Sequence, residues 1–362
     1  MQNRLENYLL FFAAIVFIFL LIQALSQTGF NWFLDFKLAS NLGTTLAGIL
    51  SFVSVVLIFL SLKKQSYQFI ISQIENRFFE LIKFHRDNVN EMEYESPQSC
   101  NKSKIELITG NKVFVAIYYE ILLSLNILEK FLNEYLKERS FGNIYKSDQV
   151  AKQRKEKINF GNRTFEFEVL EKINIAYLIV FVGVSRQGRE ILKSLLEQFY
   201  SEEFVSALIQ HYAKIPVCWS THRKQWEEGG SDLQHAEFVK YFGGHEHRLG
   251  HYFRHLYQTV TYIDASTQLN YDQKYEYIKT LRAQLSTYEQ AVIFFNSVSD
   301  LGRVWELEKH NENYQLITKY NFIKNIPAEF IENIKLKEFY PLVEYEGLEK
   351  IPEKEELKST YT

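Results

Sequence analysis

Two long uncharged segments near the N-terminus constrain this chain more than any other feature. Residues 7–34 and 38–62 contain no Asp, Glu, Lys or Arg, although 23% of the 362 residues are charged. Within them, residues 8–25 form an apolar run that would be about 27 Å long as a helix, close to a hydrocarbon core of about 30 Å. Residues 41–62 provide a second apolar run. We therefore predict two transmembrane helices, which excludes a purely soluble protein.

The two predicted spans are expected to pack as a hairpin. Gly43, Ala47 and Gly48 lie near the start of the second span, where small residues let two helices approach closely. Lys63 and Lys64 follow that span directly, so the positive-inside rule places both termini in the cytoplasm. A cleavable signal peptide is the alternative, but the N-terminal region pairs one Arg with one Glu and lacks a small-residue cleavage site.

The remainder of the chain carries mainly helical patterns. Without residues 1–64 it has 37 basic and 42 acidic residues, a net charge of −5, which does not suit a general polyanion binder. Cys100 and Cys218 form neither a disulfide framework nor a thiolate metal site. Apolar residues recur at three- and four-residue steps in several segments. These predict helices at residues 65–86, 112–138, 173–200, 244–264, 271–285, 287–300 and 312–325.

Other segments carry different patterns. Residues 164–169 alternate aromatic or aliphatic with acidic side chains, which predicts a half-buried strand. Residues 87–109 are polar and predict a connection, and residues 217–226 predict a loop. Residues 140–165 are charged and predict a surface excursion. The apolar run at residues 173–184 is too short to span a membrane, so we expect a buried core helix.

These patterns together predict a mainly α fold. Residues 1–64 are expected to form a two-helix transmembrane hairpin. Residues 65–340 are expected to form a cytoplasmic α-helical domain with at most a small β element. Residues 341–362, rich in Glu and Lys, are expected to form a flexible charged tail.

The helix predicted at residues 244–264 concentrates the chemically versatile side chains. Four of the nine histidines fall within 11 residues of it. On a helical projection one face is apolar and turns toward a core. A polar face is often merely solvated, but guanidinium groups also match phosphodiesters, and imidazoles exchange protons near neutral pH. The opposite, polar face holds His247, Arg248, His251, Arg254, His255, Gln258 and Tyr262.

Two further interpretations of this face remain. Arg248 and His255 flank six residues, a spacing that resembles the R-x(4–6)-H motif of HEPN-type ribonucleases, in which the Arg steadies the phosphate and the His transfers protons. His247 with His251, or His251 with His255, has the i,i+4 spacing of a zinc pair. However, the HExxH motif is absent and the neighbouring arginines would repel a dication, so we expect no metal. We expect no cofactor either, since no glycine-rich phosphate loop is present.

Several phrases of the sequence resemble the AbiC-like family of phage abortive infection proteins. The resemblance implies a bacterial antiviral protein whose activation stops the growth of the infected cell or kills it. A bacterial host would make the two spans a two-pass anchor of the inner membrane. The phrases are Gly250-His251-Tyr252-Phe253-Arg254, Leu256-Tyr257, Tyr262-Ile263-Asp264, Leu281 to Ser286 with Glu289, Lys319-Tyr320-Asn321, and upstream Arg77 to Leu81 with His85 and Gly110-Asn111-Lys112 with Phe114.

The resemblance also ranks the candidate residues. Arg248 and His255 lie outside the shared phrase, which favours His251 with Arg254 as the pair that acts. The candidate catalytic residues are therefore His251, Arg254, Arg248 and His255. The candidate substrate-binding residues are Tyr252, Gln258, Tyr262 and Arg282.

Three functions are compatible with this pattern. The first is a membrane-anchored effector that acts on RNA or another phosphodiester through the His/Arg face. The second is a non-enzymatic effector that senses a phage component or a nucleotide signal and oligomerises to disrupt the inner membrane. The third is a scaffold that holds another protein at the membrane. The expected partners are the lipid bilayer, further copies of the chain, an RNA or nucleotide ligand, and a phage-derived trigger or defence-system partner.

Overall fold

The computed structural model describes most of the chain after the first predicted span. It covers residues 36–97, 105–158, 165–214, 218–224, 233–239, 243–307 and 315–346, together with single helical positions at Ile15, Ile18 and Ile22. The chain divides into two compact units, Met1–Asn76 and Arg77–Thr362. The first predicted span otherwise lies outside the described residues, so the hairpin stays a prediction.

The first described helix contains the second predicted span. Helix α2 runs from Phe36 to Asn90, and Gly43–Asn90 is the one segment of the described residues that is long and apolar enough to cross a membrane. None of its most apolar 18-residue window is buried. The sequence contains neither Gly nor Pro between residues 49 and 90, which agrees with an uninterrupted helix.

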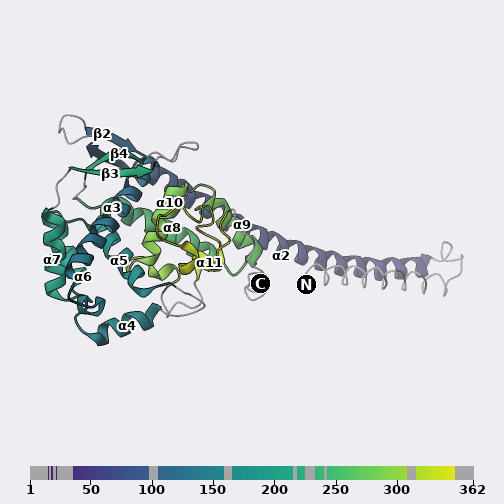
Figure 1. The fold of residues 1–362 in the computed structure, drawn as a ribbon. Helices are drawn as coiled ribbons and strands as arrows, with labels where there is room; N and C mark the ends of the chain where they lie inside the picture. Colours follow the sequence, from purple (N-terminus) through teal and green to yellow (C-terminus); the bar gives the residue numbers. More distant parts are fainter. Residues whose placement is uncertain are drawn as a thin grey trace. The chain divides into compact units, whose positions relative to one another are not determined.

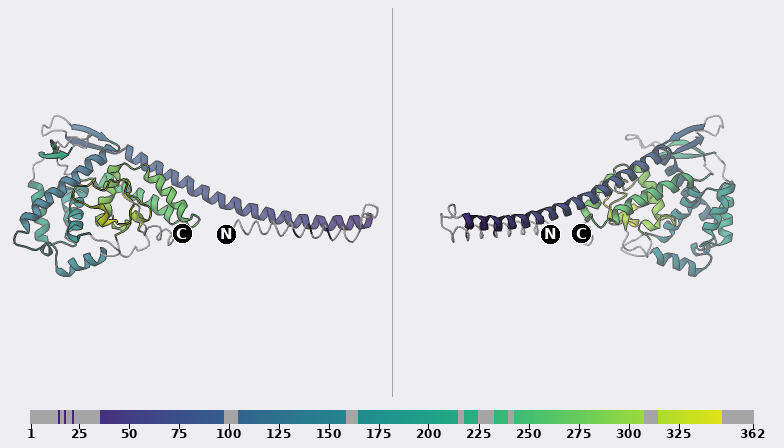
Figure 2. Two further views of the ribbon diagram at one scale, coloured as in Figure 1. Left: turned by 45° about the vertical axis from the view of Figure 1, so that its right-hand side comes forward. Right: turned by 180° about the vertical axis from the view of Figure 1, so that it is seen from behind.

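Three helices build the core of the second unit. Helix α5 (Phe167–Val182) packs against both α3 (Lys112–Tyr135) and α10 (Thr287–Val298), as Figure 1 and Figure 2 show. Nearly every α5 side chain from Leu170 onward is buried, because the helix is surrounded and therefore apolar all round. The expectation of a core helix in this region is confirmed.

Shorter helices surround these three. The predicted helix at residues 244–264 is confirmed as α8 and that at 271–285 as α9. The predicted start of α10 is also confirmed, with Ser286 and Glu289 forming the capping box. The remaining bounds are α4 (Asp148–Ile158), α6 (Arg186–Leu196), α7 (Glu202–Lys214), α8 (Glu246–Asp264), α9 (Tyr271–Arg282), α11 (Leu316–Lys319), α12 (Leu336–Phe339), and the 3₁₀ turns η2 (Phe141–Ile144) and η3 (Arg303–Trp305).

Two antiparallel hairpins make up the described strands. Strand β1 (Glu93–Pro97) pairs with β2 (Ile105–Thr109), and β3 (Cys218–Lys224) pairs with β4 (Leu233–Val239). The predictions of a plain connection at residues 87–109 and a loop at 217–226 were therefore wrong. Five-residue strands such as β1 carry little sequence signal, and their pairing partner supplies the stability.

Three further sequence predictions were wrong. Residues 167–169 are the first turn of α5 rather than a strand, because they continue directly into the apolar run of the core. The helix predicted over residues 173–200 breaks at Gly183, whose φ of +85° is not helical. Of the helix predicted over 312–325, residues 312–314 lie outside the described residues, and the described part is helical only in α11. Asn321, just beyond α11, has a φ of +51°.

A buried ionic network ties α4 to the core. Glu171 of α5 is fully buried and accepts from Nη2 of Arg154 at 2.8 Å, from Nη2 of Arg303 at 3.4 Å and from the Tyr200 hydroxyl. Asp300 pairs with both guanidinium groups, at 3.2 Å to Arg154 and 2.7 Å to Arg303. Two positive and two negative groups thus balance inside the fold.

Candidate functional site

The start of α8 is fixed by contacts with two other helices. The His245 amide donates to the Phe181 carbonyl of α5 at 2.7 Å. The imidazole of His245 is fully buried, and its Nε2 lies 2.6 Å from Oε2 of Glu120 on α3. The first turn of α8 is therefore held against α3 and α5. This contact also fixes the position of the polar side chains that follow on α8.

Two glycines allow the helices to come this close. A Cβ on Gly244, whose φ is +79°, would lie 2.2 Å from the carbonyl oxygen of Val182. A Cβ on Gly188 of α6 would lie 2.5 Å from the same oxygen. The starts of α6 and α8 thus meet at one peptide group at the end of α5, and no side chain fits between them.

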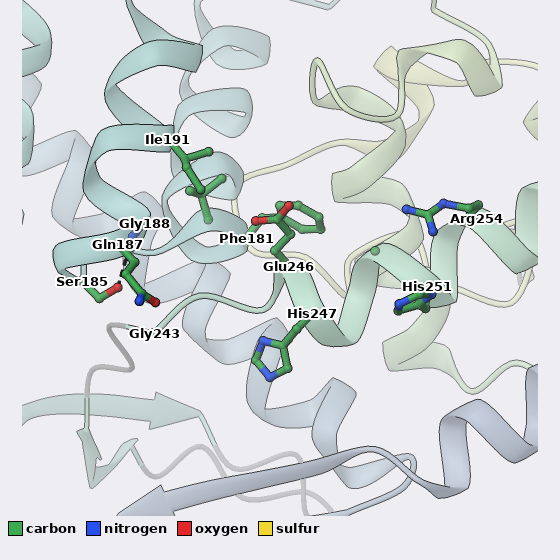
Figure 3. A pocket seen from close by; sticks show the side chains of 12 residues that line it. Phe181, Ser185, Gln187, Gly188, Ile191, Gly243, Glu246, His247, His251 and Arg254 are labelled. Carbon is green, nitrogen blue, oxygen red and sulfur yellow. Dashed lines mark hydrogen bonds between the residues drawn. The ribbon is translucent and has the colours of Figure 1, made fainter.

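A cavity of about 500 Å³ opens where these three helices meet. This volume falls within the range of small-molecule sites in proteins. Figure 3 shows the α6 side of the cavity with Ser185, Gln187 and Ile191, and the α8 side with Glu246, His247, His251 and Arg254. The lining also includes Phe181, Val182, Gly188, Gly243 and Gly250.

His251 and Arg254 are exposed to this cavity. Both lie on the same face of α8, three residues apart. Within the part of the chain that the structure describes, neither side chain has a hydrogen bond, an ion pair or a ring contact. The fold therefore does not use these two polar groups, and both are available to a ligand.

His247 adds a second imidazole to the same lining. Partial burial, with the nearby positive charge of Arg248, lowers the pKa of His247 below its usual value of 6.5. This imidazole is therefore neutral at neutral pH and can accept a proton. His247 precedes His251 by one helical turn, about 6 Å along the axis.

The N-terminus of α6 also faces the cavity. Its cap is Ser185, whose hydroxyl accepts from the Gly188 amide at 3.3 Å, and its first turn contains no acidic residue. The amides of a first turn carry partial positive charge and bind anions. Glu246 is the one carboxylate among the lining residues, so the cavity is positive or neutral elsewhere.

Arg248 and His255 do not line the cavity. Nε of Arg248 donates to the Glu93 carbonyl of β1 at 2.6 Å, and its guanidinium lies 5.6 Å from the ring centroid of Tyr94. His255 is half-buried, and the charge that it would carry helps to lower the pKa of buried His85. The structure therefore does not bring the R-x(6)-H pair together with His251 and Arg254.

The predicted substrate-binding residues are scattered. Tyr252 is fully buried against His85 and Phe114, and its hydroxyl donates to Oε1 of Glu289 at 3.4 Å. Arg282 is buried and donates from Nη1 to two backbone carbonyls. Gln258 is exposed and Tyr262 half-buried, and neither lines the cavity.

Gln187 and Gly250 are among the lining residues that were not candidate site residues. Gln187 lies on α6, about 60 residues before the histidines, so no local pattern links it to them. Gly250 could have been noticed in the sequence. A glycine inside a predicted helix is destabilising, so it indicates a packing or functional requirement. No three His, Cys, Asp or Glu side chains converge on a possible metal position among the described residues.

A comparison with known families bears on the segment that contains α8. Residues 244–331 match the family described as putative phage abortive infection protein. The match covers about a quarter of the chain and includes the resembling phrases of α8, α9 and α11, so the predicted resemblance is confirmed there. The upstream phrases around His85 and Phe114 lie outside it. No curated protein and no solved structure matches this chain.

Most of the phrases that resemble the abortive infection family build the scaffold around α8. Asp264 accepts from the Lys319 ammonium at 2.5 Å and from the Tyr320 hydroxyl at 2.6 Å. The Ser286 hydroxyl accepts from the Glu289 amide as a helix cap. His251 and Arg254 belong to the same matched segment but have no such role, which separates them from the scaffold residues.

Proposed function

We propose that this chain is a membrane-anchored bacterial effector of abortive infection that acts on RNA or another phosphodiester. The observation that carries the proposal is the pair His251 and Arg254, which is unused by the fold and faces a cavity beside the N-terminus of α6. The match to the abortive infection family supports the antiviral role. The apolar helix α2 supports anchoring in the inner membrane, with the second unit in the cytoplasm.

The lining residues suggest a mechanism for phosphodiester cleavage. Neutral His247 takes the proton of the attacking ribose 2′-hydroxyl, whose oxygen forms the new bond to phosphorus. The bond from phosphorus to the leaving oxygen breaks, and the His251 imidazole donates the proton that this oxygen takes up. Arg254 donates to the non-bridging oxygens and offsets their charge through the transition state.

A phage challenge of cells that express the full-length protein tests this proposal. We expect His251→Ala and Arg254→Ala to lose protection by at least tenfold in plaque counts. One general acid contributes about 10²–10⁴-fold in rate, and one donor to transition-state charge contributes about 10²–10³-fold. Thr280→Ala is the control, because Thr280 is exposed on α9 of the same matched segment and does not line the cavity. Full protection by both cavity variants at equal protein levels would refute the proposal.

A second function is favoured by the continuity of α2. This helix carries the apolar segment and continues without a break to Asn90, so oligomerisation of the anchor could disrupt the membrane without catalysis. Membrane potential and RNA integrity, followed together in infected cells, separate the two. An effector that cleaves RNA degrades it before the potential falls, and His251→Ala prevents both events. A membrane disruptor loses the potential while RNA is still intact.

A further inference from the structure

Gly250 is the least expected residue in the cavity lining. It lies inside α8, four residues from the first helical residue, where glycine destabilises a helix relative to alanine. Other glycines of this region are required by packing, but a Cβ on Gly250 would meet no atom within 4 Å. Neither steric crowding nor a positive φ explains why this position lacks a side chain.

The neighbours of Gly250 are the polar groups of the site. Glu246 and His247 lie one turn before it, and His251 and Arg254 follow it on the same side of α8. Helical side chains lean toward the N-terminus, so Arg254 covers the turn that contains Gly250. Figure 3 agrees, with the Arg254 guanidinium directed back along α8 toward Glu246.

We infer that Gly250 is a specificity-determining residue that lets a phosphate group of the ligand approach the backbone of α8 between His247, His251 and Arg254. This inference rests on the proposed function, in which the same cavity binds a phosphodiester. A bare backbone at this point gives the phosphate room to reach both imidazoles and the guanidinium at once. A side chain at position 250 would occupy that room and leave the fold intact.

The inference predicts opposite effects on stability and function. Gly250→Ala should raise the melting temperature of the full-length protein in detergent by about 2 °C, since alanine is the better helix former. The same variant should weaken binding of a fluorescent single-stranded RNA 10-mer and phage protection at least tenfold. Gly250→Leu should bind no more tightly than Gly250→Ala. Thr280→Ala, on α9 and outside the cavity lining, should leave binding and protection unchanged.

Two results would overturn the inference. A Gly250→Ala protein that binds the RNA and protects like the parent would mean that the space is not used. A clear fall in its melting temperature would mean that packing, and not a ligand, requires the glycine. The proposed function is judged separately by His251→Ala and Arg254→Ala. If these lose protection while Gly250→Ala keeps it, only the role of Gly250 is wrong.

Discussion

Substitution by Met should lower the melting temperature at Arg282 but not at Arg254, although both arginines lie in the matched segment. Arg282 is buried, and its Nη1 donates to the carbonyls of Tyr320 at 3.0 Å and Asn321 at 2.8 Å. Arg282→Met removes both bonds. The Asn321 carbonyl keeps the Lys324 amide as a donor, whereas the Tyr320 carbonyl loses a charged donor inside the protein. Unmade buried hydrogen bonds of this kind cost about 2–4 kcal/mol in all.

This loss is measurable by thermal unfolding of the full-length protein in detergent. A domain of this size loses about 2–4 °C of melting temperature per kcal/mol, so Arg282→Met should melt about 4–16 °C lower. Arg254→Met should melt within about 1 °C of the parent, since a surface substitution without contacts is nearly neutral, and yet lose phage protection. The reasoning is refuted if Arg282→Met melts like the parent, or if Arg254→Met melts as low as Arg282→Met.

Three other perturbations test the fold around the site. Glu171→Gln should destabilise the protein by about 3–5 kcal/mol in denaturant titrations, because Arg154 and Arg303 then share Asp300 alone and one buried positive charge is left uncompensated. A loss below about 1 kcal/mol would contradict this. Gly244→Ala should lower the melting temperature, since its Cβ would clash with the Val182 carbonyl, and an unchanged value would contradict the close approach. Burial, together with the charge of His255, lowers the pKa of the His85 imidazole from 6.5 to about 4. As the pH falls, the unfolded chain therefore binds this proton before the folded chain does. The free energy of unfolding should fall by about 3 kcal/mol between pH 6.5 and pH 4. His85→Gln should remove that dependence, and an equal slope in parent and variant would exclude His85 as its source.

Helices with a strong local signal were predictable from the sequence. The apolar stripe of α8 and the capping box of Ser286 and Glu289 each lie within a single helix, so a local sequence pattern is enough to predict them. The length of α11 was overestimated because a distant contact, and not a local pattern, ends the helix. Arg282, about 40 residues away, takes the carbonyls that a longer helix would use, and no local pattern reports such a contact.

The candidate site was predictable only in part. The sequence placed His251 and Arg254 on one polar face, and the structure places both at the cavity. The other cavity wall comes from α6, whose position depends on the glycines at 188 and 244, and that approach is not visible in sequence spacing. Arg248 shares the polar face on a helical projection, but a carbonyl of β1 binds its guanidinium. The catalytic roles stay predictions until the variants are measured.

The meeting of α6 and α8 at the Val182 peptide has a consequence for how the cavity would bind the proposed ligand. Each helix start lies against the same carbonyl, so this one close contact restrains both walls. A ligand that touches both walls meets donors already held at a fixed separation, so little ordering entropy is lost on binding. Under the proposed function, such preorganisation would favour one fixed phosphodiester linkage at the cavity, and the backbone of the protein would move little between the free and bound states.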